Sequence, residues 1–409
     1  MRPSEPFVVV GASLAGLRAV EEARAIGYSG QIILIGAEPH IPYDRPPLSK
    51  QFISPEALPD YLVQERDLRE TLDVELRMSR KATSLDAESH TVTMADGSSV
   101  RYSKLLIATG ASARTLPHLS GKDGVFTLRT LDDAREVRER LVPGANLVVI
   151  GAGFIGSEIA SSAKRLGVDV VIVEAAPAPL VRALGSRVGK LASSLHTRND
   201  VRLLLSADII GLTGGESVEG VQLGSGEVLP ADVVIVGIGA APTTDWLRGS
   251  GIDLSPLDGG VICDEMLRTS AEDVFAAGDL VHWPNGAVDS TVMRLENWTN
   301  AAEQGRRAAR NALSPDSPVA YTTVPYFWSD WYDHRIQFVG TAQADEVRII
   351  TDSEGADKWS ALYRSGDRIV GAATLNEQRK IMKYRRMIAE GTSWQHALDA
   401  FPATALAPS

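Results

Sequence analysis

Short apolar runs followed by small-residue turns dominate the first part of the chain. Residues 7–10 (FVVV) form a continuous apolar run rich in β-branched side chains, and residues 31–35 (QIILI) read as a second strand. Runs of this kind are typical of strands that are buried in a parallel sheet. The stretch between them, to about Gly27, has a helical pattern. The pattern therefore predicts a strand–turn–helix–strand unit.

The same pattern returns at residues 147–174, where residues 147–150 and 168–173 form the two strands. In each copy small residues make the turn and a glutamate ends or follows the second strand. These residues are Gly11, Ser13, Gly16 and Glu38 in the first copy, and Gly151, Gly153, Gly156 and Glu174 in the second. Two complete units predict two dinucleotide-binding domains. Two ordinary strand-to-helix turns are the alternative.

The rest of the chain is organised around these units. Residues 102–114 and 229–242 are strands that run into small-residue turns, and residues 270–284 contain a short strand that closes on Gly278 and Asp279. A helical segment runs from Asn297 to about Leu313, and alternating strands and a basic helix follow. The expected fold is α/β, with two Rossmann-like domains and a small α+β C-terminal domain. The expected boundaries are 1–115 with 242–320, then 116–241 inserted between them, then 321–409.

Composition narrows the class of protein. A chain of 409 residues is too long for one ordinary core, and no apolar run approaches the ~18 residues of a membrane span. The single cysteine, Cys263, excludes a redox cysteine pair, and the net charge of −11 argues against bulk nucleic-acid binding. Residue 7 already begins a strand, which leaves no room for a signal or transit peptide. We expect an intracellular, cytoplasmic protein without a metal.

The glycine-rich turns suit pyrophosphate binding. Their glycines let the backbone approach the phosphates, and the following helix presents free N–H groups. Glu174 lies 23 residues after Gly151, where a carboxylate can accept hydrogen bonds from a ribose and would repel a 2′-phosphate. NADH is therefore favoured over NADPH, although Arg182 lies close by and could accept the phosphate. Glu38 suits the ribose of the other nucleotide; for either glutamate, a solvated loop carboxylate is the alternative.

Two nucleotide sites predict electron relay between a visiting nicotinamide and a bound flavin. The segments that carry a specific resemblance are IPYDRPPLSK, ATGASAR, TLRTLDDA, GAGFIGSE, VGIGAAP, FAAGD, LENWTNA and YFWSD. In this order, from residue 7 to about 390, the chain resembles the bacterial ferredoxin reductases of oxygenase systems. These are the putidaredoxin-reductase and biphenyl-dioxygenase-reductase type of two-dinucleotide-binding-domain flavoproteins. The resemblance assigns FAD to the first domain and NADH to the inserted one.

The resemblance also implies roles for single residues. It places Lys50 beside the flavin, paired with Glu158, and we expect these two as the catalytic residues. It makes Asp279 the acceptor for the ribityl chain, and it gives Arg129 a cationic role near the flavin. The full set of candidate cofactor-binding residues is Gly11, Ser13, Leu14, Ala15, Gly16, Ala37, Glu38, Arg45, Lys50, Thr83, Ala108, Thr109, Gly110, Arg129, Gly278, Asp279, Glu296, Asn297, Trp298, Trp328, Gly151, Gly153, Phe154, Ile155, Gly156, Glu158, Glu174, Arg182, Gly237, Ile238 and Gly239.

Aromatic and basic residues add hypotheses about the partner. Trp298 and Trp328 occupy positions that the resemblance places near the flavin, whereas simple packing is the preferred interpretation for Trp331. Two helices are rich in basic residues, and these could form a patch for an acidic iron–sulfur ferredoxin. A solvated helix face is an equal alternative. The basic residues are Arg306, Arg307 and Arg310 in one helix, and Arg379, Lys380, Lys383, Arg385 and Arg386 in the other.

The expected function is an FAD-dependent NADH:ferredoxin oxidoreductase. NADH would pass a hydride to FAD, and single electrons would go to an iron–sulfur ferredoxin that serves a cytochrome P450 or Rieske oxygenase. A rubredoxin reductase, an NADH oxidase and a flavin-binding signalling protein resembling apoptosis-inducing factors are the alternatives. An oxidase would need an active-site cysteine in the RPPLSK region. Ser13 departs from the usual glycine, and we expect it to be tolerated if its φ is negative.

Overall fold

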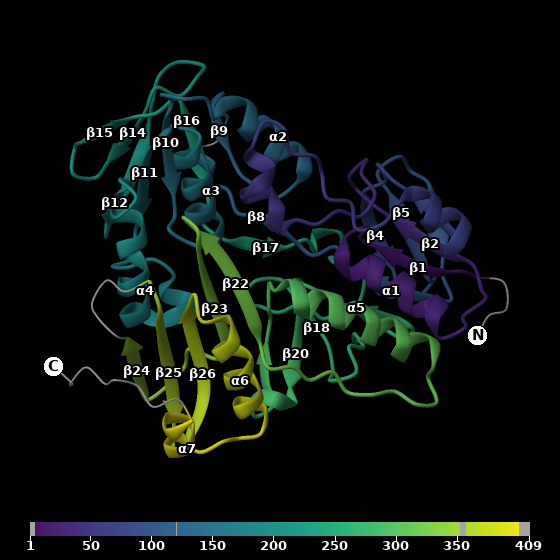
Figure 1. Ribbon diagram of the computed structural model, residues 1–409. Helices are drawn as coiled ribbons and strands as arrows, with labels where there is room; N and C mark the ends of the chain where they lie inside the picture. The colour runs from purple at the N-terminus through teal and green to yellow at the C-terminus, as the bar shows by residue number, and fades with distance from the viewer. Residues whose placement is uncertain (1–4, 120, 352–356, 401–409) are drawn as a thin grey trace. The chain divides into compact units, whose positions relative to one another are not determined.

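The computed structural model describes residues 5–119, 121–351 and 357–400 (Figure 1). The chain folds into two compact units, and each is assembled from three separate segments. Unit 1 comprises Met1–Asp44, Asp60–Ser112 and Ala240–Thr323. Unit 2 comprises Arg45–Pro59, Ala113–Gly239 and Val324–Ser409. Residues 45–59, which the sequence groups with the first domain, thus lie in unit 2.

Unit 1 is built on a sheet of five parallel strands in the order β19-β7-β1-β2-β3. The bounds in that order are Val274–Ala276, Lys104–Ile107, Phe7–Val10, Ile32–Ile35 and Val74–Arg77. The central strands are buried on both faces, which explains their uninterrupted apolar sequence. All four residues of β1, for example, are 3% exposed or less.

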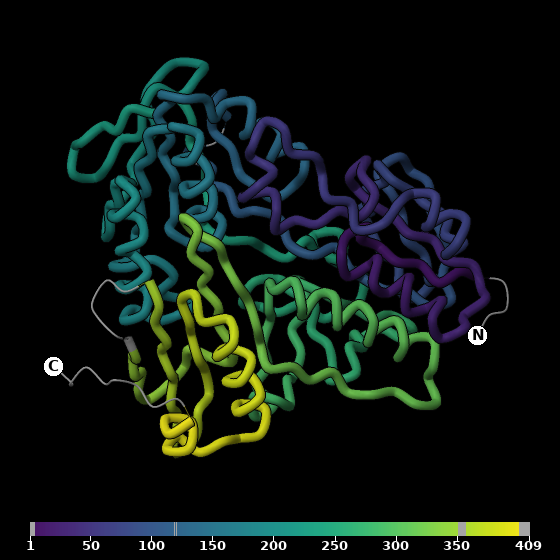
Figure 2. Tube along the Cα trace, viewed as in Figure 1, coloured from purple at the N-terminus to yellow at the C-terminus, as the bar shows by residue number. Residues whose placement is uncertain are grey.

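Two helices lie side by side against this sheet (Figure 2). They are α1, Leu14–Ala25, and α5, Trp298–Leu313, which come from opposite ends of the unit's sequence. Their close approach requires a glycine, because a Cβ at Gly305 would lie 2.2 Å from the carbonyl oxygen of Ala15. The N-terminus of α5 is thereby held close to the turn that opens α1.

The remaining strands of unit 1 form small antiparallel or mixed sheets. One has the order β4-β5-β6 and another has the order β18-β20-β21, while β8 pairs with β17. The first of these sheets consists of β4, Ala82–Asp86, β5, Thr91–Met94, and β6, Ser99–Arg101. The second consists of β18, Val261–Ile262, β20, Val281–Asn285, and β21, Thr291–Met293. The pair consists of β8, Ala111–Ala113, and β17, Ala240–Pro242.

Unit 2 contains a second sheet of five parallel strands, in the order β12-β11-β10-β16-β9. Their bounds are Arg202–Leu205, Asp169–Glu174, Asn146–Ile150, Val233–Val236 and Val125–Phe126. The unit's first helices are α2, Leu131–Arg140, α3, Phe154–Arg165, and α4, Val181–Thr197. A three-stranded sheet of β13, Ile209–Thr213, β14, Gly220–Leu223, and β15, Val228–Pro230, contacts β10 through β15.

The last part of unit 2 is an antiparallel sheet in the order β22-β23-β26-β25-β24. Its strands are Tyr326–Trp331, His334–Gly340, Arg368–Leu375, Trp359–Ser365 and Glu346–Thr351. Helix α6, Gln378–Ala389, packs on β26 and β23 through the buried side chains of Ile381 and Tyr384, and α7, Trp394–Asp399, follows. Among the helices of the described residues, none has both the length and the apolar character needed to span a bilayer.

Candidate functional site

The first glycine turn lies at the carboxyl end of the unit 1 sheet, between β1 and α1. Gly11 has φ +125°, and a Cβ there would lie 2.1 Å from the carbonyl oxygen of Ala108. A Cβ at Gly16 would lie 2.0 Å from the oxygen of Gly11. Both positions therefore require glycine. Ser13 is the N-cap residue of α1 with φ −131° and ψ −161°, which is extended backbone that serine adopts without strain.

Residues at the ends of β7 and β2 surround this turn. The Ala108 N–H donates to the Val10 carbonyl at 2.7 Å, and the Thr109 hydroxyl donates to the Thr243 carbonyl at 2.7 Å. The half-buried Glu38 accepts a hydrogen bond from the Tyr43 hydroxyl, 2.6 Å from its Oε2. The candidates Leu14, Ala15, Ala37 and Gly110 belong to the same strand ends and helix start. Thr83 instead lies exposed on β4, where its hydroxyl donates to the Thr93 carbonyl at 3.2 Å.

A second group of candidates follows β19 and precedes α5. Gly278 has φ +91°, and its N–H donates to Gln304 Oε1 at 2.8 Å. The carbonyl of Asp279 accepts a hydrogen bond from Arg294 at 2.7 Å, and the same arginine pairs with Glu296 at 2.8 Å. Sheet and helix packing thus bring both groups to one end of unit 1.

The start of α5 is fixed from both sides of its N-cap residue, Asn297. The Trp298 indole donates to Asp44 Oδ1 at 2.7 Å, and Asp44 stands in the IPYDRPPLSK segment. Tyr43 and Asp44 were not among the candidates from the sequence, yet they orient Glu38 and Trp298. The quoted segment was the only signal that could have found them.

The residues of unit 1 fit a dinucleotide such as FAD. The turn admits close approach of a pyrophosphate because glycines stand where a Cβ would clash, and α1 points its N-terminal N–H groups there. Glu38, which follows β2, supplies a carboxylate that can accept hydrogen bonds from ribose hydroxyls. In open α/β sheets ligands bind at the carboxyl ends of parallel strands, which is where these residues lie.

The second turn, in unit 2, repeats the geometry of the first. Gly151 has φ +99°, and a Cβ there would lie 2.5 Å from the Gly237 carbonyl oxygen; at Gly156 it would lie 2.1 Å from the Gly151 oxygen. The Gly237 N–H in turn donates to the Ile150 carbonyl at 2.7 Å. Gly153 is the N-cap residue of α3. The candidates Phe154 and Ile155 begin α3, and Ile155 is exposed.

The acid of the second unit contacts its own turn. Glu174 accepts hydrogen bonds from the backbone N–H groups of Ala152 at 2.7 Å and Ala176 at 2.8 Å. The exposed Arg182 lies near the end of β16, since its Nη2 is 3.3 Å from a Cβ built at Gly239. Ile238 lies beside this glycine. The turn therefore carries a carboxylate at its centre and a guanidinium at its edge.

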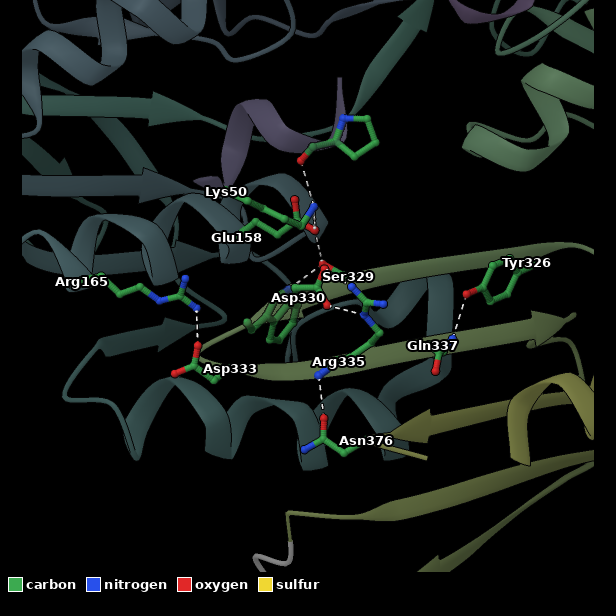
Figure 3. Close-up of polar contacts among 12 residues, drawn as sticks. Lys50, Glu158, Arg165, Tyr326, Ser329, Asp330, Asp333, Arg335, Gln337 and Asn376 are labelled. Carbon is green, nitrogen blue, oxygen red and sulfur yellow. Dashed lines mark hydrogen bonds and ion pairs between the residues drawn. The ribbon is translucent and has the colours of Figure 1, made fainter. Parts of the chain in front are cut away.

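Lys50 and Glu158 form a buried ion pair in unit 2 (Figure 3). Lys50 Nζ lies 2.8 Å from Glu158 Oε1, and the carboxylate of Glu158, a residue 3% exposed, also accepts from two serines. Ser49 Oγ donates to Oε2 at 2.5 Å, and Ser329 Oγ donates to Oε1 at 2.5 Å. These three donors compensate for the desolvation of the buried carboxylate. The carboxylate in turn holds the Lys50 ammonium in place.

Trp331 closes this network on the side of the C-terminal sheet. Its indole N–H donates to Ser329 Oγ at 2.8 Å, so the serine hydrogen is left for Glu158. Its ring stacks on His196 of α4, with centroids 4.9 Å apart and planes at 30°. His196 is fully buried, and burial lowers its pKa to about 3. Ser49, Ser329 and His196 were missed because their partners are distant in sequence.

The other aromatic and cationic candidates of unit 2 are also held by neighbours. Arg45 Nη1 donates to the Arg129 carbonyl at 2.6 Å, and the Arg129 N–H donates to Asp133 at 2.9 Å. Trp328 stacks on Tyr326, with ring centroids 5.8 Å apart. The sequence motifs of these residues thus have structural partners inside unit 2.

Several of the basic residues expected in a docking patch contact nearby acidic side chains or a backbone carbonyl. On α5, Arg310 Nε lies 2.6 Å from Glu22 Oε1. On α6, Lys380 pairs with Glu377 at 3.2 Å and Arg386 with Glu390 at 2.7 Å, while Arg385 donates to the Val324 carbonyl at 3.1 Å. The exposed positions on α6 include Arg379, Met382, Lys383 and Arg386.

Metal and cysteine chemistry have no counterpart in the described part of the chain. Residues 5–119, 121–351 and 357–400 contain no cluster of histidine, cysteine and acidic side chains that could hold a metal ion. Cys263 is buried, and burial raises the pKa of its thiol far above the ordinary value. A thiol of this kind is not a nucleophile.

Comparison with known families agrees with these two glycine turns and the separate C-terminal sheet. Residues 5–305 match the family described as pyridine nucleotide-disulphide oxidoreductase, and residues 326–408 match the family described as reductase C-terminal. The chain belongs to the pyridine nucleotide-disulphide oxidoreductase family. The resemblance, the fold class and the enzyme class expected from the sequence are confirmed.

The relatives include reductases of oxygenase systems. Rhodocoxin reductase from Rhodococcus erythropolis is 33% identical over 94% of this chain and 89% of its own length. The ferredoxin–NAD(+) reductase component of the anthranilate 1,2-dioxygenase system from Burkholderia cepacia is 35% identical, with 95% of each chain covered. A crystal structure of the covalent putidaredoxin reductase–putidaredoxin complex superposes with a TM-score of 0.89, 29% identity and 95% and 94% coverage.

Proposed function

We propose that this protein is an FAD-dependent NADH:ferredoxin reductase of an oxygenase system. The main support for this function is the pair of glycine turns, one at the carboxyl end of each parallel sheet. The same chain also matches the reductase C-terminal family. The names of the relatives support the acceptor, because they include rhodocoxin reductase and a ferredoxin–NAD(+) reductase component. The three-domain division and a cytoplasmic location remain part of this proposal.

In this proposal unit 1 holds FAD. The turn at Gly11 and the start of α1 receive the pyrophosphate, Glu38 receives the adenosine ribose, and Asp279 receives the ribityl chain. Bound FAD supplies hydride acceptance and single-electron release. Tyr43 holds the Glu38 carboxylate in place through its hydroxyl, 2.6 Å away.

The turn of unit 2 receives NADH. A negative carboxylate already sits on the backbone of this turn, because Glu174 accepts from the Ala152 N–H at 2.7 Å. A 2′-phosphate would meet this charge, whereas ribose hydroxyls can donate to it. The exposed Arg182 is the cation that could reduce the discrimination against NADPH. We therefore expect NADH to be preferred in kcat/KM.

Lys50 and Glu158 supply fixed charge rather than proton transfer. We expect Lys50 beside the flavin, where its ammonium would stabilise the negative charge that the cofactor gains on reduction. Glu158 keeps the ammonium in place, with Ser49 and Ser329 completing the hydrogen bonds of its carboxylate. Trp331 can only donate, so the network ends at this indole on the side of Ser329.

An acidic ferredoxin would dock on the exposed stripe of α6. Arg379, Met382, Lys383 and Arg386 recur at spacings of three and four, which places them on one face of the helix. An exposed methionine among cations suits a small acidic partner. We expect Lys383→Glu to lower kcat/KM for ferredoxin and to weaken its salt dependence. Lys190→Glu, on the exposed side of α4, is the matched charge reversal and should change neither.

The proposal is tested by anaerobic titration of the purified protein with NADH. NADH should bleach a flavin absorption band, and a panel of iron–sulfur ferredoxins assayed with NADH and NADPH should identify the donor and the acceptor class together. A colourless protein, or a flavin that NADH does not bleach, would refute the proposal. Rapid oxygen consumption without ferredoxin would favour an oxidase.

A flavin-binding signalling protein is the second candidate. Apoptosis-inducing factor 3 from Homo sapiens is 36% identical over 95% of this chain, which spans 64% of that protein. Very slow reduction by NADH, with a long-lived charge-transfer band and no transfer to any ferredoxin, would favour this candidate. Fast reduction and ferredoxin turnover would exclude it.

A further inference from the structure

Arg294 joins the two segments of unit 1 to which the flavin is assigned. It follows β21, and its side chain is 13% exposed. Nη1 donates to the main-chain carbonyl of Asp279 at 2.7 Å and pairs with Glu296 Oε1 at 2.8 Å. One guanidinium nitrogen therefore fixes both the end of the Gly278–Asp279 turn and the segment that opens α5.

Asp258 anchors this arginine from the opposite side. Arg294 Nε lies 2.7 Å from Asp258 Oδ2, while Oδ1 accepts from the Gly260 N–H at 3.0 Å and lies 2.8 Å from His282 Nε2. Burial alone would raise the pKa of Asp258, but the hydrogen bonds from Gly260, His282 and Arg294 lower it below its ordinary value. The carboxylate is thus a stable anion, and it holds Arg294 in one orientation.

The start of α5 depends on flanking contacts of this kind. Asn297 is the N-cap residue, and its side chain makes no capping hydrogen bond. The helix start is held instead by the Glu296–Arg294 pair before the cap and by the Trp298–Asp44 hydrogen bond after it. The direction in which α5 presents its positive end therefore depends on Arg294.

We propose that Arg294 is a positioning residue for the flavin, because it ties the main chain of Asp279 to the segment that opens α5. The inference rests on the proposed function, since it concerns the FAD site of that reaction. An arginine is required, because a planar guanidinium reaches three acceptors in fixed directions. A lysine has one nitrogen and cannot satisfy Asp258, Asp279 and Glu296 with that geometry.

The test compares FAD and NADH binding in matched variants of the holoenzyme. Arg294→Met should raise the dissociation constant of FAD tenfold or more, measured from flavin fluorescence on serial dilution, and should shift the visible flavin band. Arg294→Lys should recover part of the loss. The control is Arg248→Met, because the side chain of Arg248 is 79% exposed and pairs with the exposed Asp245 at 3.0 Å. This control should bind FAD as the wild type does.

A structural role is separated from a positioning role by the second ligand. The NADH dissociation constant and the far-UV circular dichroism of Arg294→Met should match those of Arg248→Met. Equal FAD affinity in the two variants would overturn the inference, as would parallel losses of FAD and NADH binding. Asp258→Asn keeps the shape of its site and should weaken FAD binding in the same direction if Arg294→Met fails to fold. A wild type without FAD would instead refute the proposed function.

Discussion

The buried His196 should make the protein lose stability as the pH falls from 7 to 5. Its ring is fully buried, stacks on Trp331 and has Nδ1 2.8 Å from the Tyr332 hydroxyl oxygen. Nε2 has no hydrogen-bond partner among the described residues. Burial lowers the pKa from 6.5 to about 3, so between these values the unfolded chain binds a proton that the folded protein excludes. Stability therefore falls with pH in this window.

The magnitude follows from this shift. Each pH unit inside the window is worth about 1.4 kcal/mol, and most of the interval from pH 7 to 5 lies inside it. Integration gives a loss of about 2 kcal/mol from His196 alone. His196→Gln does not titrate and keeps an acceptor for the Tyr332 hydroxyl. We expect the variant to be less stable at pH 7 because stacking on Trp331 is lost, but to lose about 2 kcal/mol less than the wild type on going to pH 5.

The assay is urea unfolding of both holoproteins at pH 7 and pH 5, followed by far-UV circular dichroism. The other six histidines and all carboxylates are common to both proteins, so their titration cancels in the double difference. An equal loss of stability in wild type and variant would show that His196 does not gain a proton on unfolding in this pH range. So would an NMR titration in which the His196 ring changes protonation near pH 6.5.

Three further predictions concern the turns and the buried carboxylate. Ser13→Gly should change the FAD dissociation constant by about twofold or less, because serine is unstrained at φ −131°; a large gain in affinity would contradict this. Gly11→Ala should abolish FAD retention, since its Cβ would lie 2.1 Å from the Ala108 oxygen, and a variant purified with full flavin content would disprove the close approach. Ser329→Ala should destabilise the protein by about 1–3 kcal/mol, measured by thermal unfolding, because Glu158 loses a donor at 2.5 Å. An unchanged melting temperature would argue against that hydrogen bond.

The sequence predicts the elements that local patterns determine. The run at residues 7–10 is β1 as observed, because four β-branched or aromatic apolar residues leave no other interpretation before a glycine turn. The helix start at Asn297 is also observed, one residue before α5 begins. Residues whose role is conformational, such as Gly11 and Gly151, are identified by their spacing alone. Their positive φ values supply the physical reason.

Contacts between distant segments lie beyond such patterns. Ser329 and Glu158 are 171 residues apart, and nothing in YFWSD shows which carboxylate the serine approaches. Arg294 and Asp258 are separated by 36 residues in loops of no regular period. Simple packing was the preferred interpretation for Trp331, which is buried but also donates an indole hydrogen bond to Ser329. The sequence does not distinguish a tryptophan that only packs from one that also donates a hydrogen bond. Side-chain partnership of this kind depends on tertiary packing.

The threading of the chain through its two units bears on how the protein is made. The last segment of unit 1 ends at Thr323 and includes β19 and α5. Unit 2 combines residues 45–59 with the C-terminal sheet, which follows Thr323 in the sequence. The segments of the two units alternate along the chain. During synthesis unit 1 can therefore be completed only after two of the three segments of unit 2 have been made. The edge of β7 that pairs with β19 therefore stays without its partner strand until residue 276 has been synthesised. Protein synthesised without chaperones should aggregate from these nascent chains rather than from the finished fold.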